Sequence, residues 1–283
     1  MTKIAIITDT DSSLPPQMAA EHGIRQVPIG IHFDGESFTS GLDIDDRLLF
    51  EKVDQLNCLP TTTAPNPADF ISAFELAFQE GSEAIVCICV SGEVSSTYAS
   101  AVTAREHFPE RDIRVIDSRN ISMAQGFMVL AAAEAAARNA STSEIVELVG
   151  ATGTKMCTFA VVPTLKYLAL SGRVSKFVSG LANTLHIKPI LAIKDGKLDL
   201  LEKVRTQTKA IDRMLVLLSK AARNKKIERV AIIHVNELAG AIEMEALLRK
   251  NFHCPEEIII AEFTPGLSVH TGSGVVGVVF QTD

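Results

Sequence analysis

Residues 84–101, AIVCICVSGEVSSTYASA, pass from an apolar run to a run of small polar residues after Val90, and this change indicates the fold. The apolar run 84–90 is typical of a buried strand, the small polar residues after it predict a loop, and Ser95 or Ser96 stands where a helix N-cap is expected. Backbone N–H groups in the first turn of a helix lack intrahelical partners, and the helix dipole adds partial positive charge there. The stretch can therefore hold an anion, although serines that only cap the helix explain the same residues.

Strand and helix patterns alternate on both sides of this stretch. Aliphatic runs at 3–8 and 113–116 predict buried strands, and one longer strand is expected over 24–33. Helices are predicted over 67–79 and, in an alanine-rich segment, over 121–138. Strands that alternate with helices pair in parallel, and ligands of such sheets bind beyond the carboxyl ends of the strands.

The second half of the chain has a different pattern. Residues 190–193 and 198–204 flank Asp195-Gly196 and predict a hairpin, which a purely parallel sheet does not contain. The predicted fold is α/β, with an N-terminal parallel-sheet α/β domain at 1–155 and a C-terminal α/β domain at 156–283. The C-terminal sheet is expected to be mixed and partly antiparallel.

The composition excludes several function classes. The 283 residues are 47% hydrophobic but only 5% aromatic, so the interior is expected to be mainly aliphatic. A formal charge of -7 argues against nucleic acid or an anionic membrane as the main partner. The five cysteines are scattered without metal-ligand spacing, and no apolar run approaches the length of a membrane span. We therefore expect a soluble, cytoplasmic protein without a metal or cofactor and without stable insertion in the membrane.

Three other stretches carry candidate functional residues. Thr61-Thr62-Thr63-Ala64-Pro65 predicts a second hydroxyl-rich loop ahead of a helix, and His270 stands beside a glycine-rich turn at 272–274. Asp9 and Asp11 follow the first strand.

The two aspartates leave two hypotheses open. They resemble the nucleophile loop of haloacid-dehalogenase-type phosphatases, in which one Asp attacks phosphorus and a magnesium ion is required. The acidic pair that completes such a metal site is missing from the later predicted strand ends, which carry Ser91, Ser118 and Pro163. The alternative is that Asp9 and Asp11 only fix a turn through hydrogen bonds to their own backbone.

The order of short motifs along nearly the whole chain resembles the DegV family of bacterial fatty-acid-binding proteins. These motifs are T-D-x-x-S near the start, T-T-x-P, S-x-x-x-S-x-T-Y, D-S, x-G-R, K-P-I-L with the Asp-Gly hairpin, K-x-R, and H-T-G-x-G. Their order and spacing carry the resemblance, since no single motif is specific.

The resemblance implies a carrier that is not itself an enzyme. It would bury a long-chain fatty acid and present the carboxylate to a separate ATP-dependent kinase, which makes acyl phosphate for phospholipid synthesis. The implied carboxylate-binding residues are Thr62, Thr63, Ser95, Ser96 and His270, the last acting directly or through water. By the same comparison, contacts with the kinase are implied for two basic residues, Arg173 and Arg205.

The chain departs from the family pattern at four positions. Glycine or proline of the family is replaced by Ser96, Ala124, Ser171 and Ser273. These replacements bear on loop geometry and on docking of the kinase, and they remove none of the implied hydroxyl donors. A further hypothesis, a regulatory or interaction module without a ligand, fits the aliphatic composition equally well.

Overall fold

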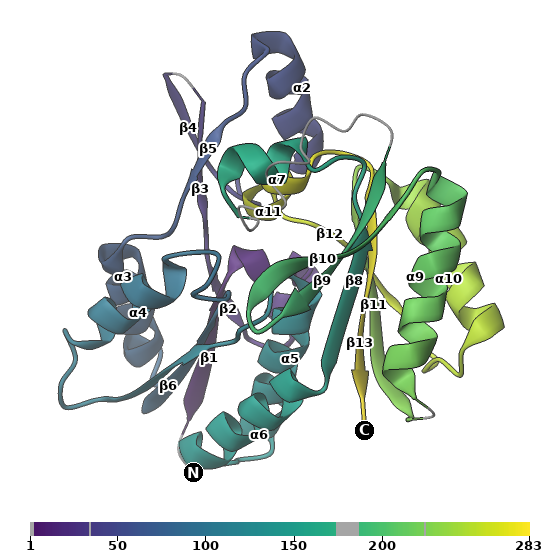
Figure 1. Ribbon diagram of the computed structural model, residues 1–283. Helices are drawn as coiled ribbons and strands as arrows, with labels where there is room; N and C mark the ends of the chain where they lie inside the picture. Colours follow the sequence, from purple (N-terminus) through teal and green to yellow (C-terminus); the bar gives the residue numbers. More distant parts are fainter. Residues whose placement is uncertain (1–2, 34, 174–186, 224) are drawn as a thin grey trace. The chain divides into compact units, whose positions relative to one another are not determined.

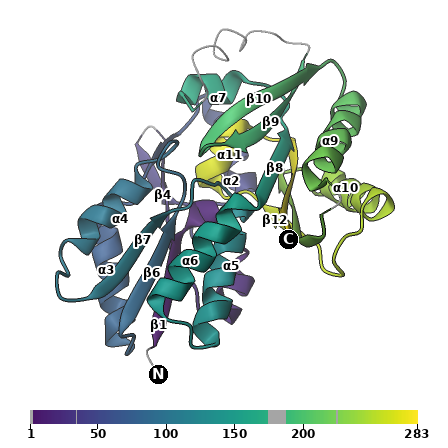
Figure 2. The ribbon, with the colours of Figure 1, turned by 60° about the horizontal axis from the view of Figure 1, so that its bottom comes forward.

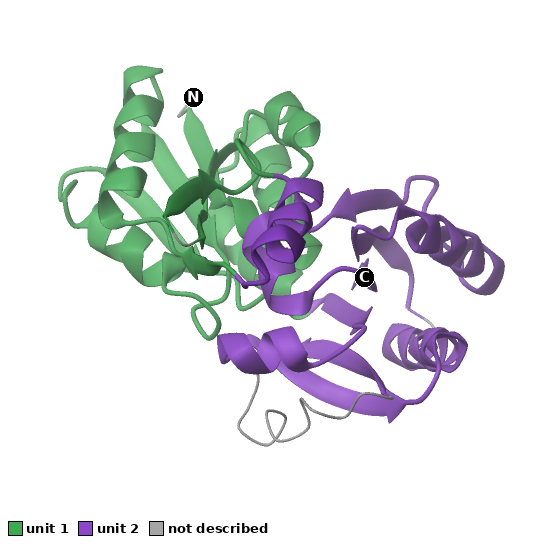
Figure 3. Ribbon diagram, turned by 90° about the horizontal axis from the view of Figure 1, so that it is seen from above, with its two compact units in different colours: residues 1–44, 60–154 green, residues 45–59, 155–283 purple. Residues whose placement is uncertain are grey.

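The computed structural model describes residues 3–33, 35–173, 187–223 and 225–283. The chain forms two compact units, coloured separately in Figure 3. The first unit contains Met1–Ile44 and Pro60–Thr154, and the second contains Asp45–Leu59 and Lys155–Asp283. The segment 45–59, which precedes most of the first unit in sequence, is thus grouped with the second unit, whereas the predicted N-terminal domain includes it.

The first unit contains the predicted parallel sheet, with strand order β2-β1-β6-β7. Its strands are β1 (Ile4–Asp9), β2 (Arg25–Val27), β6 (Ala84–Cys89) and β7 (Asp112–Asp117). Every residue of β6 is buried, as expected for a central parallel strand covered on both faces. Because the strands run in the same direction, the segments after β1, β6 and β7 meet at one edge of the sheet.

Helices cover both faces of this sheet. Figure 2 shows α3 (Pro67–Gln79) and α4 (Thr97–Arg105) on one face, and α5 (Met123–Ala137) and α6 (Thr142–Thr154) on the other. Phe70 and Phe74 of α3 are fully buried in the core formed with α4 and the sheet. Almost every position of α5 is buried, which matches its apolar composition on all sides. The short elements η1 (Thr10–Ser12) and α1 (Pro16–Glu21) follow β1.

A separate three-stranded antiparallel sheet, in the order β4-β3-β5, belongs to the same unit. It is formed by β3 (Gly30–Phe33), β4 (Glu36–Thr39) and β5 (Thr61–Thr63). The prediction of one strand over 24–33 is wrong, since β2 ends at Val27 and β3 begins in another sheet at Gly30. Pro28 lies at the break, and proline has no N–H group with which to continue the ladder.

The second unit is built on a mixed six-stranded sheet in the order β10-β9-β8-β13-β11-β12. The strands are β8 (Met156–Val161), β9 (Lys188–Lys194), β10 (Lys197–Val204), β11 (Ile227–Val235), β12 (Ile259–Glu262) and β13 (Val275–Thr282). The β11–β12 pair is parallel and the other pairs are antiparallel. The predicted hairpin is confirmed, because Lys194 pairs with Lys197 around Asp195-Gly196, and both turn residues have positive φ.

Among the described residues, five helices belong to the second unit. In Figure 1, α9 (Gln207–Ala222) and α10 (Leu238–Asn251) lie along one face of the six-stranded sheet, where Met214 and Met244 enter its apolar core. The other three are α2 (Asp46–Leu56), α7 (Lys166–Ser171) and α11 (Pro265–Thr271). Helix α11 packs against both α2 and α7. No helix of the described ranges is long and apolar enough to cross a membrane.

Candidate ligand-binding site

The segment from β6 to α4 is a strand, a loop and a helix N-terminus, as predicted. The first three backbone N–H groups after β6 already donate hydrogen bonds to neighbouring segments at the same edge of the sheet. Val90 donates to Asp9 Oδ2 at 2.8 Å, Ser91 to the carbonyl of Asn120 at 3.0 Å, and Gly92 to Asp117 Oδ1 at 3.1 Å. These amides hold the loop in place and are not available to an anion. A ligand that binds this loop must therefore bind further along, towards α4.

Ser95 lies at that end of the loop, two residues before the first residue of α4. Its backbone N–H donates to the carbonyl of Ser91 at 3.2 Å, and its Oγ accepts the backbone N–H of Thr97 at 3.3 Å. Ser95 Oγ is also 2.8 Å from the hydroxyl of Thr97. When Thr97 donates in this pair, the Ser95 hydroxyl keeps its own proton for a ligand. In that arrangement half-buried Ser95 is a donor beside the positive end of a helix dipole.

Ser96 occupies the N-cap position of α4, but its side chain makes no capping hydrogen bond. The side chain is exposed. One of the two serines was expected to cap the helix, and the two share this role. Ser96 stands at the N-cap position, whereas the side chain of Ser95 accepts an N–H group of the first turn.

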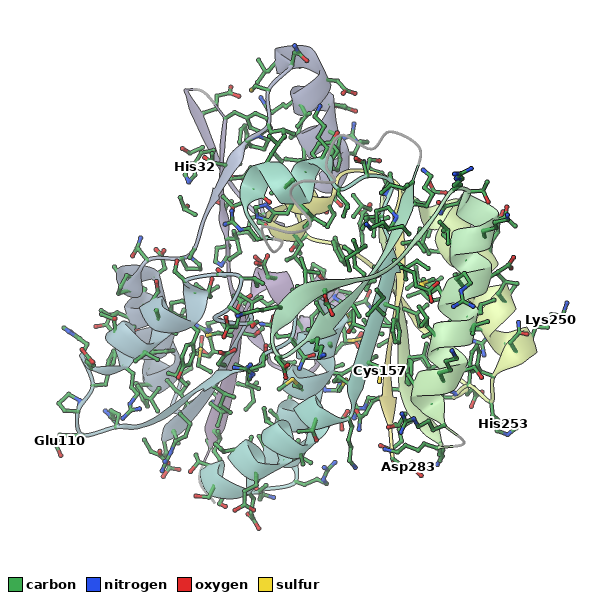
Figure 4. All side chains as sticks on the ribbon, in the orientation of Figure 1. His32, Glu110, Cys157, Lys250, His253 and Asp283 are labelled. Atoms are coloured by element: carbon green, nitrogen blue, oxygen red, sulfur yellow. The ribbon has the colours of Figure 1, made fainter. Side chains whose placement is uncertain are left out.

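The threonine segment forms strand β5 instead of the expected loop. Thr62 pairs with Ile31 and Thr63 with Gly30 in register with β3, so successive threonine side chains point to opposite faces. Exposed Thr63 lies with its Oγ1 2.8 Å from Nε2 of His32, which is labelled in Figure 4. Half-buried Thr62 lies on the other face, so the two threonines cannot both point towards one carboxylate without a change in the strand.

Asp9 is completely buried at the end of β1 and accepts hydrogen bonds on both carboxylate oxygens. Oδ1 accepts the N–H of Asp11 at 3.0 Å, whereas Oδ2 accepts from Val90 and from Gln125 Nε2, the latter at 3.1 Å. Burial raises the pKa of this carboxyl group to about 6, against the opposing effect of the three donors.

This environment is that of a buried structural acceptor. A phosphatase nucleophile needs an accessible carboxylate oxygen, and Asp9 has none exposed. In residues 3–33, 35–173, 187–223 and 225–283, no group of three or more His, Cys, Asp or Glu side chains is arranged to hold a metal ion.

His270 lies in the last turn of α11, in the second unit. Burial, and secondarily the positive charge of Arg173, lower the pKa of its imidazole to about 3. The ring is therefore neutral at pH 7 and offers one N–H donor, which suits it to a hydrogen bond and not to an ion pair with an anion.

The glycine-rich turn after His270 is closely packed. Gly272 ends α11 with a φ of 80°, and a Cβ atom at this position would lie 2.5 Å from the ring of Tyr167 on α7. Gly272 is therefore required by both its backbone conformation and its neighbour.

The two basic residues implied in docking lie at separate turns of the second unit. Arg173 follows Gly172 at the end of α7, where its Nη1 donates to the carbonyl of Ser171 at 2.6 Å. Arg205 is exposed between β10 and α9. The Ser171 hydroxyl, which stands where the family has glycine, donates to the carbonyl of Leu168.

Gln125 is the main residue of this sheet edge that the sequence patterns did not indicate. It is fully buried on α5 and donates to Thr8 Oγ1 at 2.9 Å as well as to Asp9. The available signal was a lone amide inside an otherwise apolar helix, since a buried amide requires hydrogen-bond partners.

Comparisons with known proteins cover the whole chain. The sequence profile described as "Uncharacterised protein, DegV family" matches residues 3–283. A DegV domain-containing protein of Caldanaerobacter subterraneus subsp. tengcongensis is 34% identical over 281 residues, 99% of each chain. A solved DegV family structure from Thermus thermophilus, described by its fatty acid binding, has a TM-score of 0.91 at 27% identity. DegV of Bacillus subtilis, described as a fatty acid binding protein, has a TM-score of 0.90 at 28% identity. Both structures match over 100% of each chain.

Proposed function

The chain belongs to the DegV family, and from this premise we propose that it binds a long-chain fatty acid and presents its carboxylate to a separate kinase. One observation carries the proposal: the fold agrees over its full length with two fatty-acid-binding relatives, at TM-scores of 0.91 and 0.90. The proposed protein is a carrier without catalytic residues, metal or cofactor, and it acts in the cytoplasm, where ATP is available to the kinase.

The energetics divide the work between the acyl chain and the carboxylate. Each buried methylene contributes about 0.8 kcal/mol, whereas one hydrogen bond to a charged group contributes about 1.5 to 3 kcal/mol. The acyl chain would therefore supply most of the affinity. The polar groups would orient the ligand, because a carboxylate buried without donors is strongly unfavourable.

Ser95 is the proposed principal donor to the carboxylate. Its hydroxyl lies at the N-terminus of the nine-residue helix α4 and accepts the backbone N–H of Thr97, and its proton is available to a ligand when the Thr97 hydroxyl donates in the Ser95–Thr97 pair. Thr62 is the proposed second donor of the first unit. Ser96, Thr63 and the neutral imidazole of His270 remain proposed contributors that need separate tests.

Native mass spectrometry before and after organic extraction tests the binding proposal. Protein purified from cells should carry a mass matching a long-chain fatty acid, extraction should remove it, and added oleate should restore a one-to-one complex. The absence of any bound fatty acid, together with no uptake of oleate, would overturn the proposal.

The kinase step has its own test. Arg173→Ala and Arg205→Ala should lower the rate of acyl phosphate formation in the presence of ATP and the kinase, while the affinity for oleate stays unchanged. Lys250→Ala, a matched removal of one positive charge on α10, should change neither quantity. Loss of oleate binding in Arg173→Ala would show that the docking assignment is wrong.

A further inference from the structure

The loop that carries Ser95 is held by acidic side chains from both neighbouring strands. Asp9, at the end of β1, binds the N–H of Val90, and Asp117, at the end of β7, binds the N–H of Gly92. The residue between them, Ser91, is bound by the carbonyl of Asn120. These three consecutive anchors fix the direction in which the chain leaves β6.

The anchors are connected to Ser95 by one further hydrogen-bonded step. The carbonyl of Ser91 accepts the N–H groups of Val94 at 3.1 Å and Ser95 at 3.2 Å. A displacement of Val90 or Ser91 would therefore move the turn that contains Ser95. Such a movement would misdirect its hydroxyl relative to the N-terminus of α4.

The two aspartates differ in how they hold the loop. Asp9 uses both oxygens, because Asp11 donates to Oδ1 while Val90 and Gln125 donate to Oδ2. An asparagine at position 9 can keep Val90 and Gln125 on its oxygen and turn its NH2 group towards Asp11 alone, whereas alanine leaves the N–H of Val90 without its acceptor. Asp117 uses Oδ1 for both Gly92 and Arg119, at 3.1 and 2.8 Å, so asparagine can replace it with both hydrogen bonds kept.

From this geometry we infer that Asp9 is a positioning residue for fatty-acid binding, which sets the orientation of the Ser95 hydroxyl through Val90 and Ser91. The inference rests on the proposed function. The carboxylate of Asp9 is completely buried and bonded to protein groups on both oxygens, so its proposed role is indirect. If Asp9 acted only through its negative charge, it would repel a bound carboxylate, and removing the charge would tighten binding. If Asp9 acts by positioning Ser95, removing its side chain weakens binding.

A double-mutant cycle tests this inference, with oleate and oleyl alcohol as probes. Asp9→Ala, which leaves the N–H of Val90 without its acceptor, should weaken oleate binding about tenfold, the effect of one misplaced hydrogen bond to a charged group. It should have no further effect in a Ser95→Ala background, because the hydroxyl it positions is then absent. Binding of oleyl alcohol, whose neutral hydroxyl accepts a weaker hydrogen bond than a carboxylate does, should weaken much less. Asp117→Asn removes the same charge with its hydrogen bonds kept, and should not weaken oleate binding.

Each result has a defined meaning. Equal weakening of oleate and oleyl alcohol, or equal weakening with and without Ser95, would overturn the inference and assign Asp9 to general stability. Tighter oleate binding in Asp9→Ala would leave only the charge effect and also overturn it. If Asp9→Ala does not fold, Gln125→Leu, which removes one of the two donors that hold Oδ2 of Asp9 against Val90, is measured in the same cycle. Failure of the wild-type protein to bind oleate would instead overturn the proposed function itself.

Discussion

The hydroxyl of Ser268 donates a hydrogen bond to the carboxyl group of Asp46 at 2.6 Å, across a sequence separation of 222 residues. Both side chains are buried, Asp46 in the first turn of α2 and Ser268 on α11. The bond joins α2, in the segment 45–59 of the second unit, to α11, the helix that also carries His270. Burial raises the pKa of Asp46 to about 8, and the negative charges of Glu262 and Asp45 add to the increase.

The Asp46 proton makes stability depend on pH. The unfolded chain loses this proton near pH 4, whereas the folded protein keeps it until about pH 8, so stability falls as the pH rises through this window. Asp46→Asn can keep the bond from Ser268 and removes the dependence. We expect the variant to be more stable than the wild type by at least about 1 kcal/mol at pH 8.

Urea denaturation at pH 5 and pH 8.5 measures this effect. Asp54→Asn, an exposed change on the same helix, should follow the wild type at both pH values. Parallel pH profiles for Asp46→Asn and the wild type would contradict the raised pKa.

His270 should have the opposite pH dependence. Its pKa is lowered to about 3, so the unfolded chain takes up a proton near pH 6.5 while the folded protein does not. The free energy of unfolding therefore falls as the pH drops from about 6.5 towards 3, because the unfolded chain binds a proton at His270 that the folded protein does not. His270→Gln should gain stability relative to the wild type between pH 7 and pH 4.5 in denaturant unfolding. His253→Gln, at the exposed site labelled in Figure 4, should show no such relative gain.

Single hydroxyl deletions should identify the groups that bind the carboxylate. Ser95→Ala and Thr62→Ala should each weaken oleate binding by about 1 to 3 kcal/mol, because each removes a donor to a charged group. Isothermal titration calorimetry of the extracted protein measures the change. Thr103→Ala, which removes a hydroxyl bonded to the carbonyl of Ala99 on α4, is the control and should bind as the wild type does.

The other two hydroxyls serve as internal comparisons in the same experiment. Thr63→Ala should have a smaller effect than Thr62→Ala, since the Thr63 hydroxyl pairs with His32 on the opposite face of β5. Ser96→Ala should have a smaller effect than Ser95→Ala, since Ser96 is exposed. The reverse order in either pair would contradict the proposed site.

The turn after His270 should tolerate no side chain at Gly272. Alanine there would adopt an unfavourable positive φ and also place its Cβ 2.5 Å from the Tyr167 ring. Gly172→Ala is the matched control, with a φ of 72° and no atom within 4 Å of the added Cβ. We expect Gly172→Ala to cost about 1 to 2 kcal/mol, and Gly272→Ala to cost at least about 1 kcal/mol more. Chemical denaturation gives both values, and equal costs would show that Tyr167 moves aside freely.

Sequence patterns were reliable where a structure depends on residues close along the chain. The apolar run of β6 and the Asp195-Gly196 turn predicted a buried strand and a hairpin, because burial of consecutive side chains and turn dihedrals are local properties. The mixed second sheet followed from that hairpin, since two strands joined by two residues must be antiparallel.

Patterns failed where the partner is distant. Thr61–Thr63 was expected to be a loop and became a strand, because β3 supplies a ladder about thirty residues earlier in the chain. Residues 24–33 have one continuous strand-like pattern, yet Pro28 separates two strands that pair in different sheets. Neither pairing can be found from local composition.

The sequence by itself determined that a hydroxyl-rich loop follows β6 at the start of a helix, and the order of its motifs indicated the family. Only the tertiary structure decided which atoms that loop binds. Its amides at Val90 and Gly92 are held by carboxylates 81 and 25 residues away, so they are withdrawn from any ligand. The physical reason is that hydrogen bonds of this sheet edge form between strands brought together by the packing of the parallel sheet, whatever their separation along the chain.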